Sequence, residues 1–247
     1  MFCNLFDKKI LITGASSGIG SETAFVSASR GATPILVGRD IERLENVKNR
    51  ILESEYRCGN IYSIDLSTSE GVNKLVRNIK EPVDGIVFSA GISKPRPLQL
   101  ITEEYLDENF SINTFSPFLI LSKLQKSRLI SPNASIVFLS SIAAVTGTKG
   151  TVIYSASKGA LIGASKALAD ELSKKKIRVN VVSPAVVRTA IFSSEQEGYL
   201  EEQSKKYPLG LASTLDIAAT IVFLISDSSI SITGENIVID SGCTNIS

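Results

Sequence analysis

The sequence predicts a doubly wound α/β fold, and three observations carry this prediction. Short runs rich in Ile, Val, Leu and Phe alternate repeatedly with longer amphipathic segments along the whole chain. The apolar runs are nearly continuous, which is typical of parallel strands that helices cover on both faces. No linker, composition break or low-complexity tract divides the 247 residues. We therefore expect one domain over residues 1–247, built on a mostly parallel sheet with right-handed crossovers.

The expected elements follow one another in strand–helix order. Several helices start at residues suited to an N-cap, such as Asp40 and Thr214. Residues 189–212 are polar and show no periodicity, so we expect a loop that acts as a lid over a binding site. The predicted strands are 10–13, 35–37, 61–64, 85–88, 135–139, 179–182 and 236–239. The predicted helices are 18–29, 40–53, 68–79, 102–129, 154–174 and 214–226.

Composition argues against several classes of function. The 26 basic and 25 acidic residues give a net charge of +1, so nothing indicates a nucleic-acid-binding surface. The apolar stretch near 217–225 is far shorter than the roughly 20 residues of a membrane span, and the first residues do not read as a secretory signal. The scattered Cys3, Cys58 and Cys243 form neither a metal-binding spacing nor a disulfide framework, which favours a cytoplasmic location.

The count of histidines narrows the chemistry further. A chain with 0 His has no Ser-His-Asp or Cys-His mechanism and no His-ligated metal centre. If the protein is an enzyme, its proton transfer must use Tyr, Lys, Asp, Glu, Ser or Cys. We expect no metal site.

A glycine-rich turn follows the first predicted strand. Residues 13–20 read TGASSGIG and lead directly into a predicted helix. Glycines permit a tight turn and let backbone amides approach a phosphate, while the helix N-terminus contributes its positive dipole end. The spacing G-x-x-x-G-x-G differs from the usual G-x-G-x-x-G dinucleotide fingerprint, and a turn without a ligand is the alternative. Its place in the first strand–helix unit favours dinucleotide binding.

The end of the second predicted strand bears on the choice of dinucleotide. An acidic residue there would bind the ribose 2′-hydroxyl of NAD, whereas an arginine nearby can pair with the 2′-phosphate of NADP. This chain has Gly38 followed by Arg39, which favours NADP(H). In the alternative interpretation Arg39 is a surface residue, Asp40 is only a helix cap, and NAD(H) is the cofactor.

Tyr154 and Lys158 stand four residues apart in a predicted helix and therefore share a face. An ammonium group roughly 5 Å from a phenol, at an effective dielectric of about 20, favours the phenolate by about 3 kcal/mol, or about two pKa units. Such a tyrosine could serve as a general acid or base. Ser141 follows a buried-looking strand and could bind a carbonyl oxygen. The alternatives are a chance pair on a solvated helix face and a serine that caps its own turn.

Taken together, these motifs resemble the short-chain dehydrogenase/reductase superfamily. The likeness follows the family's order and covers nearly the whole chain. It rests on 13–20 (TGASSGIG), 88–91 (FSAG), Asn113, Ser141, Tyr154-x-x-x-Lys158 and 183–185 (SPA). The resemblance implies a single-domain Rossmann fold, a doubly wound and mostly parallel seven-stranded sheet of order 3-2-1-4-5-6-7.

The resemblance also implies a role for each matching residue. Ser141 would position and polarise the substrate carbonyl, and Tyr154 would exchange the proton with it. Lys158 would hold the cofactor ribose and depress the tyrosine pKa, and Asn113 would anchor a water that links the lysine to solvent. The expected cofactor-binding residues are Gly14, Ser16, Ser17, Gly18, Ile19, Gly20, Arg39, Asp65, Leu66, Ala90, Gly91, Tyr154, Lys158, Pro184, Val187 and Thr189.

The chain also departs from the family pattern. Phe88 and Ser89 replace the two asparagines of the usual Asn-Asn-Ala-Gly, so the hydrogen bonds of those asparagines must be replaced or lost. Ala185 stands where glycine is usual and could narrow the pocket. Ser17 occupies a position that is often basic in NADP-dependent members, which leaves Arg39 as the principal 2′-phosphate ligand.

Within the superfamily the chain looks most like 3-oxoacyl-[acyl-carrier-protein] reductases and similar small ketoreductases. The implied function is NADP(H)-dependent interconversion of a ketone and a secondary alcohol, free or linked to a carrier protein, by a homo-oligomer (tetramer or dimer). Basic residues 174–176 could help to recognise a carrier protein, or form a solvated helix end. The alternatives are a non-catalytic dinucleotide sensor or scaffold, and a dehydratase or epimerase on the same fold.

Overall fold

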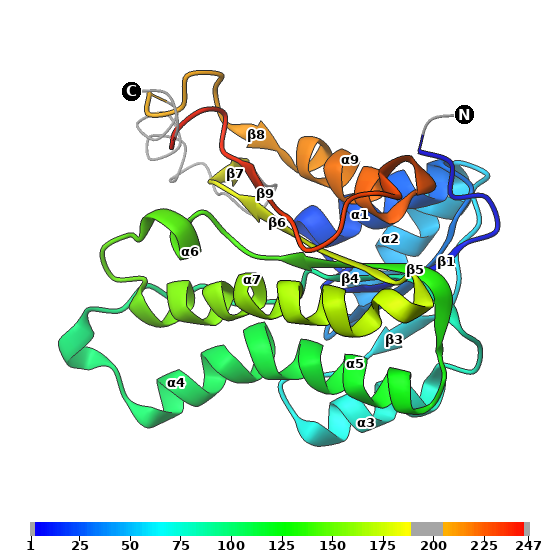
Figure 1. Ribbon diagram of the computed structural model, residues 1–247, viewed down its shortest axis with the longest axis horizontal. Helices are drawn as coiled ribbons and strands as arrows, with labels where there is room; N and C mark the ends of the chain where they lie inside the picture. The colour runs from blue at the N-terminus through cyan, green and yellow to red at the C-terminus, as the bar shows by residue number, and fades with distance from the viewer. Residues whose placement is uncertain (1–2, 189–204, 245–247) are drawn as a thin grey trace.

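A computed structural model of the chain describes residues 3–188 and 205–244. Seven parallel strands form one sheet of order β3-β2-β1-β4-β5-β6-β9, with helices on both faces (Figure 1). The predicted order is confirmed; the seventh predicted strand is β9, because β7 (Val187–Arg188) and β8 (Ala212–Ser213) form a separate pair. The sheet strands are β1 (Lys9–Thr13), β2 (Thr33–Gly38), β3 (Ile61–Ser63), β4 (Val83–Phe88), β5 (Ile130–Leu139), β6 (Arg178–Pro184) and β9 (Asn236–Ile239).

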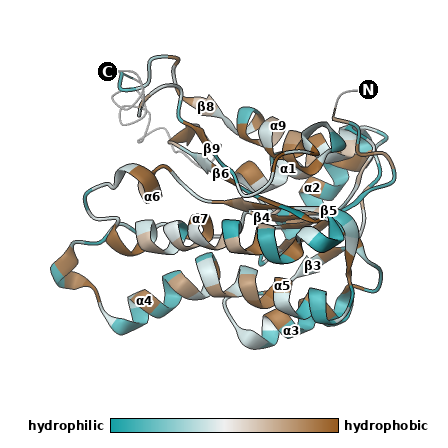
Figure 2. Cartoon of the chain, viewed as in Figure 1, coloured by the Kyte–Doolittle hydropathy of each residue, from teal (hydrophilic) through white to brown (hydrophobic). Residues whose placement is uncertain are grey.

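The helices form two layers, one on each face of the sheet (Figure 1). One layer contains α1 (Gly18–Ser29), α2 (Ile41–Glu53) and α9 (Thr214–Ile225). The other contains α3 (Ser69–Asn78), α4 (Glu103–Phe110), α5 (Ser116–Lys126) and α7 (Val152–Leu172), and a short α6 (Ala143–Thr146) precedes α7. In Figure 2 these covering helices carry hydrophilic as well as hydrophobic residues, as expected when only one side of each helix is buried.

Two hydrophobic cores lie between these layers and the sheet. Successive strand residues point to opposite faces, so Ile10 and Ile12 enter the core under α1 and α9, while Leu11 enters the core under α5 and α7. All three side chains are fully buried. Burial on both faces explains why the strands read as continuous apolar runs.

The structure confirms one predicted helix cap, moves another by one residue, and adds a π-helical turn to one predicted helix. Asp40 caps α2 as predicted, because its carboxylate accepts a hydrogen bond from the Arg43 amide at 3.1 Å. Thr214 is not a cap: Ser213 forms a capping box with Asp216, and Thr214 is the first residue of α9. The helix predicted over 102–129 is present as α4, a π-helical turn η2 (Ser111–Phe115) and α5, which follow one another without a gap; the π-helical turn within it was not predicted.

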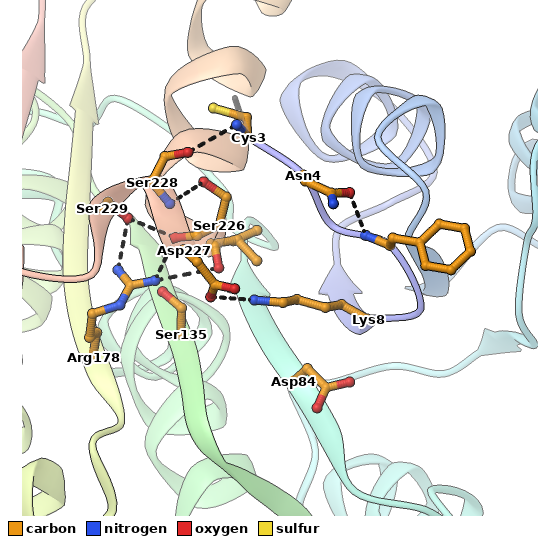
Figure 3. Close-up of polar contacts among 12 residues, drawn as sticks. Cys3, Asn4, Lys8, Asp84, Ser135, Arg178, Ser226, Asp227, Ser228 and Ser229 are labelled. Carbon is orange, nitrogen blue, oxygen red and sulfur yellow. Dashed lines mark hydrogen bonds and ion pairs between the residues drawn. The ribbon is translucent and has the colours of Figure 1, made fainter. Parts of the chain in front are cut away.

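The carboxyl end of α9 is fastened to the first residue of β6, at the edge of the sheet where the parallel strands begin (Figure 3). The buried Arg178 guanidinium donates hydrogen bonds to the carbonyls of Leu224 at 2.7 Å and Ser226 at 3.0 Å, and to the Ser229 hydroxyl at 2.9 Å. A cation is favourable at this end of a helix because the unpaired carbonyls carry partial negative charge.

Two further findings concern the described residues. None of their helices is long and apolar enough to cross a membrane. No cluster of Cys, Asp or Glu side chains among them is arranged to hold a metal ion. Three 3-10 turns complete the connections, η1 (Leu98–Leu100), η3 (Ser173–Lys175) and η5 (Asp227–Ser229).

Candidate active site

The glycine-rich turn packs tightly between β1, α1 and the loop after β4. Gly14 has φ +68°, and a Cβ there would lie 2.7 Å from the Ala90 amide nitrogen. A Cβ on Gly20 would lie 2.5 Å from Ser89 Oγ and closer still to the Gly14 carbonyl. Neither position has room for a side chain, so the backbone of the turn itself forms the surface. Both positions therefore require glycine for lack of space, and Gly14 requires it for its backbone conformation as well.

The amino end of α1 is open to an anion. The N-cap residue Ser17 makes no side-chain cap hydrogen bond, and the first turn of the helix holds no acidic residue. The first-turn amides of a helix without a cap need an acceptor, and a phosphate supplies one. This end of α1 therefore fits the pyrophosphate of a dinucleotide.

A cavity of about 340 Å³ opens beside this turn, at the carboxyl ends of β1, β2 and β4. Most of the expected cofactor-binding residues line it: Gly14, Ser16, Ser17, Ile19, Gly20, Arg39, Asp65, Leu66, Ala90 and Gly91. Gly18 is not among the lining residues; it starts α1 with φ +54°. The sequence analysis missed Gly38, Ile64, Ser67, Ser89, Ile92, Glu108, Ile112 and Leu139, which also line the cavity.

Arg39 and Asp65 lie at the β2–β3 end of this cavity. The Asp65 carboxylate accepts hydrogen bonds from the Ser67 amide at 2.9 Å and the Ser67 hydroxyl at 2.7 Å. These bonds, together with the positive charge of Arg39, hold the pKa of Asp65 below its usual value. The Ser63 hydroxyl donates to the Arg39 carbonyl at 2.7 Å and so fixes the backbone of that residue. Arg39 thus presents a cation at the cavity, and the residue that ends β2 before it, Gly38, brings no carboxylate.

A second cavity of about 240 Å³ adjoins the first and shares Ile19, Ser89, Gly91, Ile92 and Leu139 with it. The residues expected to carry the chemistry come together here, although they belong to different elements. Ser141 follows β5, whereas Tyr154 and Lys158 lie one turn apart on α7. Pro184, Ala185 and Val187 form the wall contributed by β6 and β7.

Tyr154 and Ser141 are in direct contact. A hydrogen bond with the Ser141 side chain acts to lower the pKa of Tyr154, but burial has the larger effect and raises this pKa above its usual value. In the free protein burial thus outweighs the hydrogen bond, and the expected effect of Lys158 on this phenol stays a prediction. Ser141 Oγ also accepts a hydrogen bond from the Ala143 amide at 3.2 Å, so the serine caps its own turn as well.

The surroundings of Lys158 disfavour its charged form. Its side chain is buried, with 4% of the residue exposed, and the ammonium donates to the Leu139 carbonyl at 2.8 Å. Burial lowers the pKa of Lys158 to about 8, because the charged form loses its hydration. The ammonium is thus held less favourably than in water, and it donates a hydrogen bond to a backbone carbonyl.

Asn113 lies in the π-helical turn and holds the loop after β4. Its Oδ1 accepts from the Ile92 amide at 2.9 Å, and its Nδ2 donates to the Ile92 carbonyl at 3.0 Å. A Cβ on Gly91 would lie 2.9 Å from Asn113 Oδ1 and 3.1 Å from Lys158 Nζ. Asn113 and Lys158 can approach the same point only because residue 91 has no side chain.

Some residues that the sequence assigned to the site lie outside the described residues or away from both cavities. Thr189 and most of the expected lid, residues 189–204, lie outside the described residues. Basic residues 174–176 follow the far end of the 21-residue α7, roughly 30 Å along the helix from Tyr154. They are exposed there, which agrees with a solvated helix end rather than with a surface beside the cavity.

Ser89, which stands where the family usually has asparagine, makes a hydrogen bond of its own. Its hydroxyl donates to the Thr13 carbonyl at 2.6 Å and so ties the end of β1 to the loop after β4. The hydrogen bonds expected from the missing asparagines are thus replaced in part by a shorter side chain. Ala185 lines the second cavity, as its place next to Pro184 suggested.

Comparison with known proteins places these features in context. The family profile described as enoyl-(acyl carrier protein) reductase matches residues 14–244. The chain is 32% identical over 246 residues to an NAD-dependent glycerol dehydrogenase of Listeria innocua, covering 98% of this chain and 95% of that protein. It is 32% identical over 241 residues to a 3-oxoacyl-[acyl-carrier-protein] reductase of Thermotoga maritima, covering 95% and 97%.

Among solved structures, the fold resembles L-sorbose reductase from Gluconobacter frateurii, determined in complex with NADPH and L-sorbose. The TM-score is 0.91 at 26% identity, and the match covers 100% of both chains. These similar proteins differ in their named substrates.

Proposed function

Because the chain belongs to the short-chain dehydrogenase/reductase family, we propose that it interconverts a ketone and a secondary alcohol with a nicotinamide dinucleotide. One observation carries this proposal: Ser141, Tyr154 and Lys158 line a cavity that adjoins the cavity of the glycine-rich turn. A hydride carrier in the first cavity and a carbonyl in the second would meet where the two share their walls. The open amino end of α1 supports the fit of the dinucleotide.

The side chains divide the work on the carbonyl oxygen. When bound, the nicotinamide supplies a hydride to the carbonyl carbon or takes one from the alcohol. Ser141 orients the oxygen by a hydrogen bond, and Tyr154 donates its phenolic proton to the alkoxide that develops there. The phenol is protonated at neutral pH and can therefore act as the donor in the reduction, although burial raises the pKa of Tyr154 and makes it a weaker acid in the free protein. In the reverse direction the phenolate must accept the proton.

We propose NADP(H) as the preferred cofactor. Arg39 presents a guanidinium group at the first cavity, and Gly38 supplies no carboxylate to bind a ribose 2′-hydroxyl. NAD(H) is the alternative, because the similar protein from Listeria is named as NAD-dependent. Replacing Arg39 with Ala should weaken NADP binding at least tenfold and leave NAD binding within twofold, because only NADP carries the 2′-phosphate. Equal losses for both dinucleotides would refute the preference.

The proposed substrate is a 3-oxoacyl group, free or linked to a carrier protein, or another small carbonyl compound. A screen of ketones followed by loss of reduced-nicotinamide absorbance tests the reaction. Tyr154→Phe should reduce turnover by several orders of magnitude and keep dinucleotide affinity, because the ring remains and only the proton is lost. Turnover close to wild type in this variant would remove Tyr154 from the reaction. Dinucleotide binding without turnover of any ketone would instead favour a sensor or scaffold.

We also propose a homo-oligomer, formed through the outward faces of α5 and α7. Phe115 and Leu119 lie one turn apart and are 50% and 41% exposed. On α7, a Cβ at Gly159 or Gly163 would meet nothing within 4 Å, so another helix could come close there. Light scattering on the purified protein should give a dimer or tetramer, and Leu119→Lys should shift it towards monomer. A monomeric mass for the wild type would refute this proposal.

A further inference from the structure

Ser157 occupies a central place among the residues of the second cavity without lining it. It lies on α7 next to Lys158, and none of its surface is exposed. Its hydroxyl donates to the Tyr154 carbonyl at 2.8 Å and accepts a hydrogen bond from Asn113 Nδ2 at 3.0 Å. Its own carbonyl accepts from the Thr114 hydroxyl at 2.9 Å. Two consecutive residues of the π-helical turn are therefore bound to one residue of α7.

The bonds of Asn113 extend this connection to the cavity wall. Both hydrogens of its amide group are used, one on Ser157 and one on the Ile92 carbonyl, while its oxygen holds the Ile92 amide. Ile92 lines both cavities and follows Gly91, the residue above the Lys158 ammonium. A continuous series of hydrogen bonds thus runs from α7 through Asn113 to the loop after β4.

We propose that Ser157 is a positioning residue for the reaction, acting through Asn113. It fixes the rotation of the Asn113 amide and thereby holds the Gly91–Ile92 segment at its present distance from Lys158. This inference rests on the proposed function, because it assigns Ser157 to the same site. The physical need is clear: Asn113 is 1% exposed, so without Ser157 one amide hydrogen would remain buried with no acceptor. The amide would turn to find another partner and would release Ile92.

The same helix contains a matched control. Ser165 is also fully buried, and its hydroxyl donates to the Ile162 carbonyl at 2.8 Å, the same back-bond to the residue three positions earlier. Ser157 differs in holding Asn113 in addition. Changing either serine to alanine removes the same back-bond from the same helix. Any difference between the two variants therefore isolates the bond to Asn113.

The first experiment compares Ser157→Ala with Ser165→Ala in the full-length enzyme. We expect Ser157→Ala to lower kcat about tenfold, since small displacements of positioned groups are costly in rate. The pH at which kcat reaches half its maximum should move, because the surroundings of the Lys158 ammonium change. Dinucleotide affinity, measured by the fluorescence of the reduced cofactor, should stay within twofold. Ser165→Ala should leave kcat and the pH profile unchanged.

The second experiment tests whether Ser157 acts through Asn113. If it does, Ser157→Ala should lower kcat no further in an Asn113→Ala background, whereas Ser165→Ala should have the same small effect in either background. Ser157→Cys, which keeps most of the volume but accepts hydrogen bonds weakly, replaces Ser157→Ala in both experiments if the alanine variant does not fold.

Three results would overturn the inference: equal kcat values for Ser157→Ala and wild type, equal losses in Ser157→Ala and Ser165→Ala, or independent losses from Ser157→Ala and Asn113→Ala. Each of these leaves the proposed reaction intact when the wild-type enzyme reduces a ketone and Tyr154→Phe does not. Failure of the wild type to reduce any ketone would instead refute the proposed function itself.

Discussion

Replacing Lys158 with methionine removes a buried ammonium group while keeping a side chain of similar length. Burial lowers the pKa of Lys158 from 10.5 to about 8, which corresponds to about 3 kcal/mol by which folding disfavours the charged lysine at pH 7. The hydrogen bond from Nζ to the Leu139 carbonyl, 2.8 Å long, offsets about 1 kcal/mol of this. We therefore expect Lys158→Met to be inactive, and more stable than wild type by about 2 kcal/mol at pH 7.

The dependence of this difference on pH follows from the two protonation states. An unfolded lysine keeps its proton up to about pH 10.4, whereas Lys158 in the folded protein releases it near pH 8. Between these two values the unfolded state binds more protons, so raising the pH stabilises the folded wild type. The advantage of Lys158→Met should thus be fully present below pH 8 and should diminish steadily between about pH 8 and pH 10.4.

Urea unfolding at pH 7, 8, 9 and 10, followed by far-UV circular dichroism, measures these differences. In a separate thermal unfolding experiment at pH 7, the Tm should rise by about 4 to 8 °C for a chain of this size. Lys166→Met, on an exposed position of the same helix, is the control and should change the free energy of unfolding by less than about 0.5 kcal/mol at every pH. If Lys158→Met is less stable than wild type at pH 7, or if their difference does not change with pH, the ammonium is not disfavoured by burial and the reasoning fails.

Two further predictions concern the proposed reaction and its cofactor. Burial raises the pKa of Tyr154, and alcohol oxidation needs the phenolate. The rate of alcohol oxidation should therefore rise continuously from pH 7 into the alkaline range, whereas the rate of ketone reduction should stay level and then fall. An oxidation rate that is flat over this range in a stopped-flow assay would contradict the role of Tyr154. Gly20→Ala should weaken dinucleotide binding at least tenfold in a titration, because its Cβ would overlap the Gly14 carbonyl. Gly163→Ala, whose new methyl meets no atom of its own chain within 4 Å, should keep dinucleotide affinity. Equal dinucleotide affinity in both variants would show that the turn does not form the phosphate site.

Elements that depend on neighbouring residues were predictable from the sequence. The helix predicted over 18–29 coincides with α1, and the cap at Asp40 is present because its carboxylate needs only the Arg43 amide three residues away. The cap predicted at Thr214 was displaced by one residue, since Ser213 and Asp216 form a reciprocal pair. Such errors are small because both alternatives use the same local hydrogen bonds.

The π-helical turn between α4 and α5 was not predictable from neighbouring residues. Periodicity shows a continuous amphipathic segment, and a π-helical turn adds one residue that leaves little trace in the pattern. What favours the turn lies elsewhere in the chain: Asn113 binds Ile92, 21 residues before it, and Ser157, 44 residues after it. For the same reason Ser157, Ile92 and Glu108 were missed as parts of the site, whereas Tyr154 and Lys158 were found from their spacing on one helix and from the resemblance to the family.

The amino-acid sequence alone indicated the alternation of strands and helices, the position of the glycine-rich turn and the set of residues able to transfer a proton, because apolar pattern, glycine content and the absence of histidine are properties of the chain; the order of the strands in the sheet came from the resemblance to the family. How those residues titrate depends on the folded environment and could not be read from the chain. The spacing of Tyr154 and Lys158 suggested that the ammonium would make the phenol acidic, yet folding buries both groups and turns the ammonium to the Leu139 carbonyl. The free energy of a charge depends on the solvent and dipoles around it, and these come from segments distant in the chain.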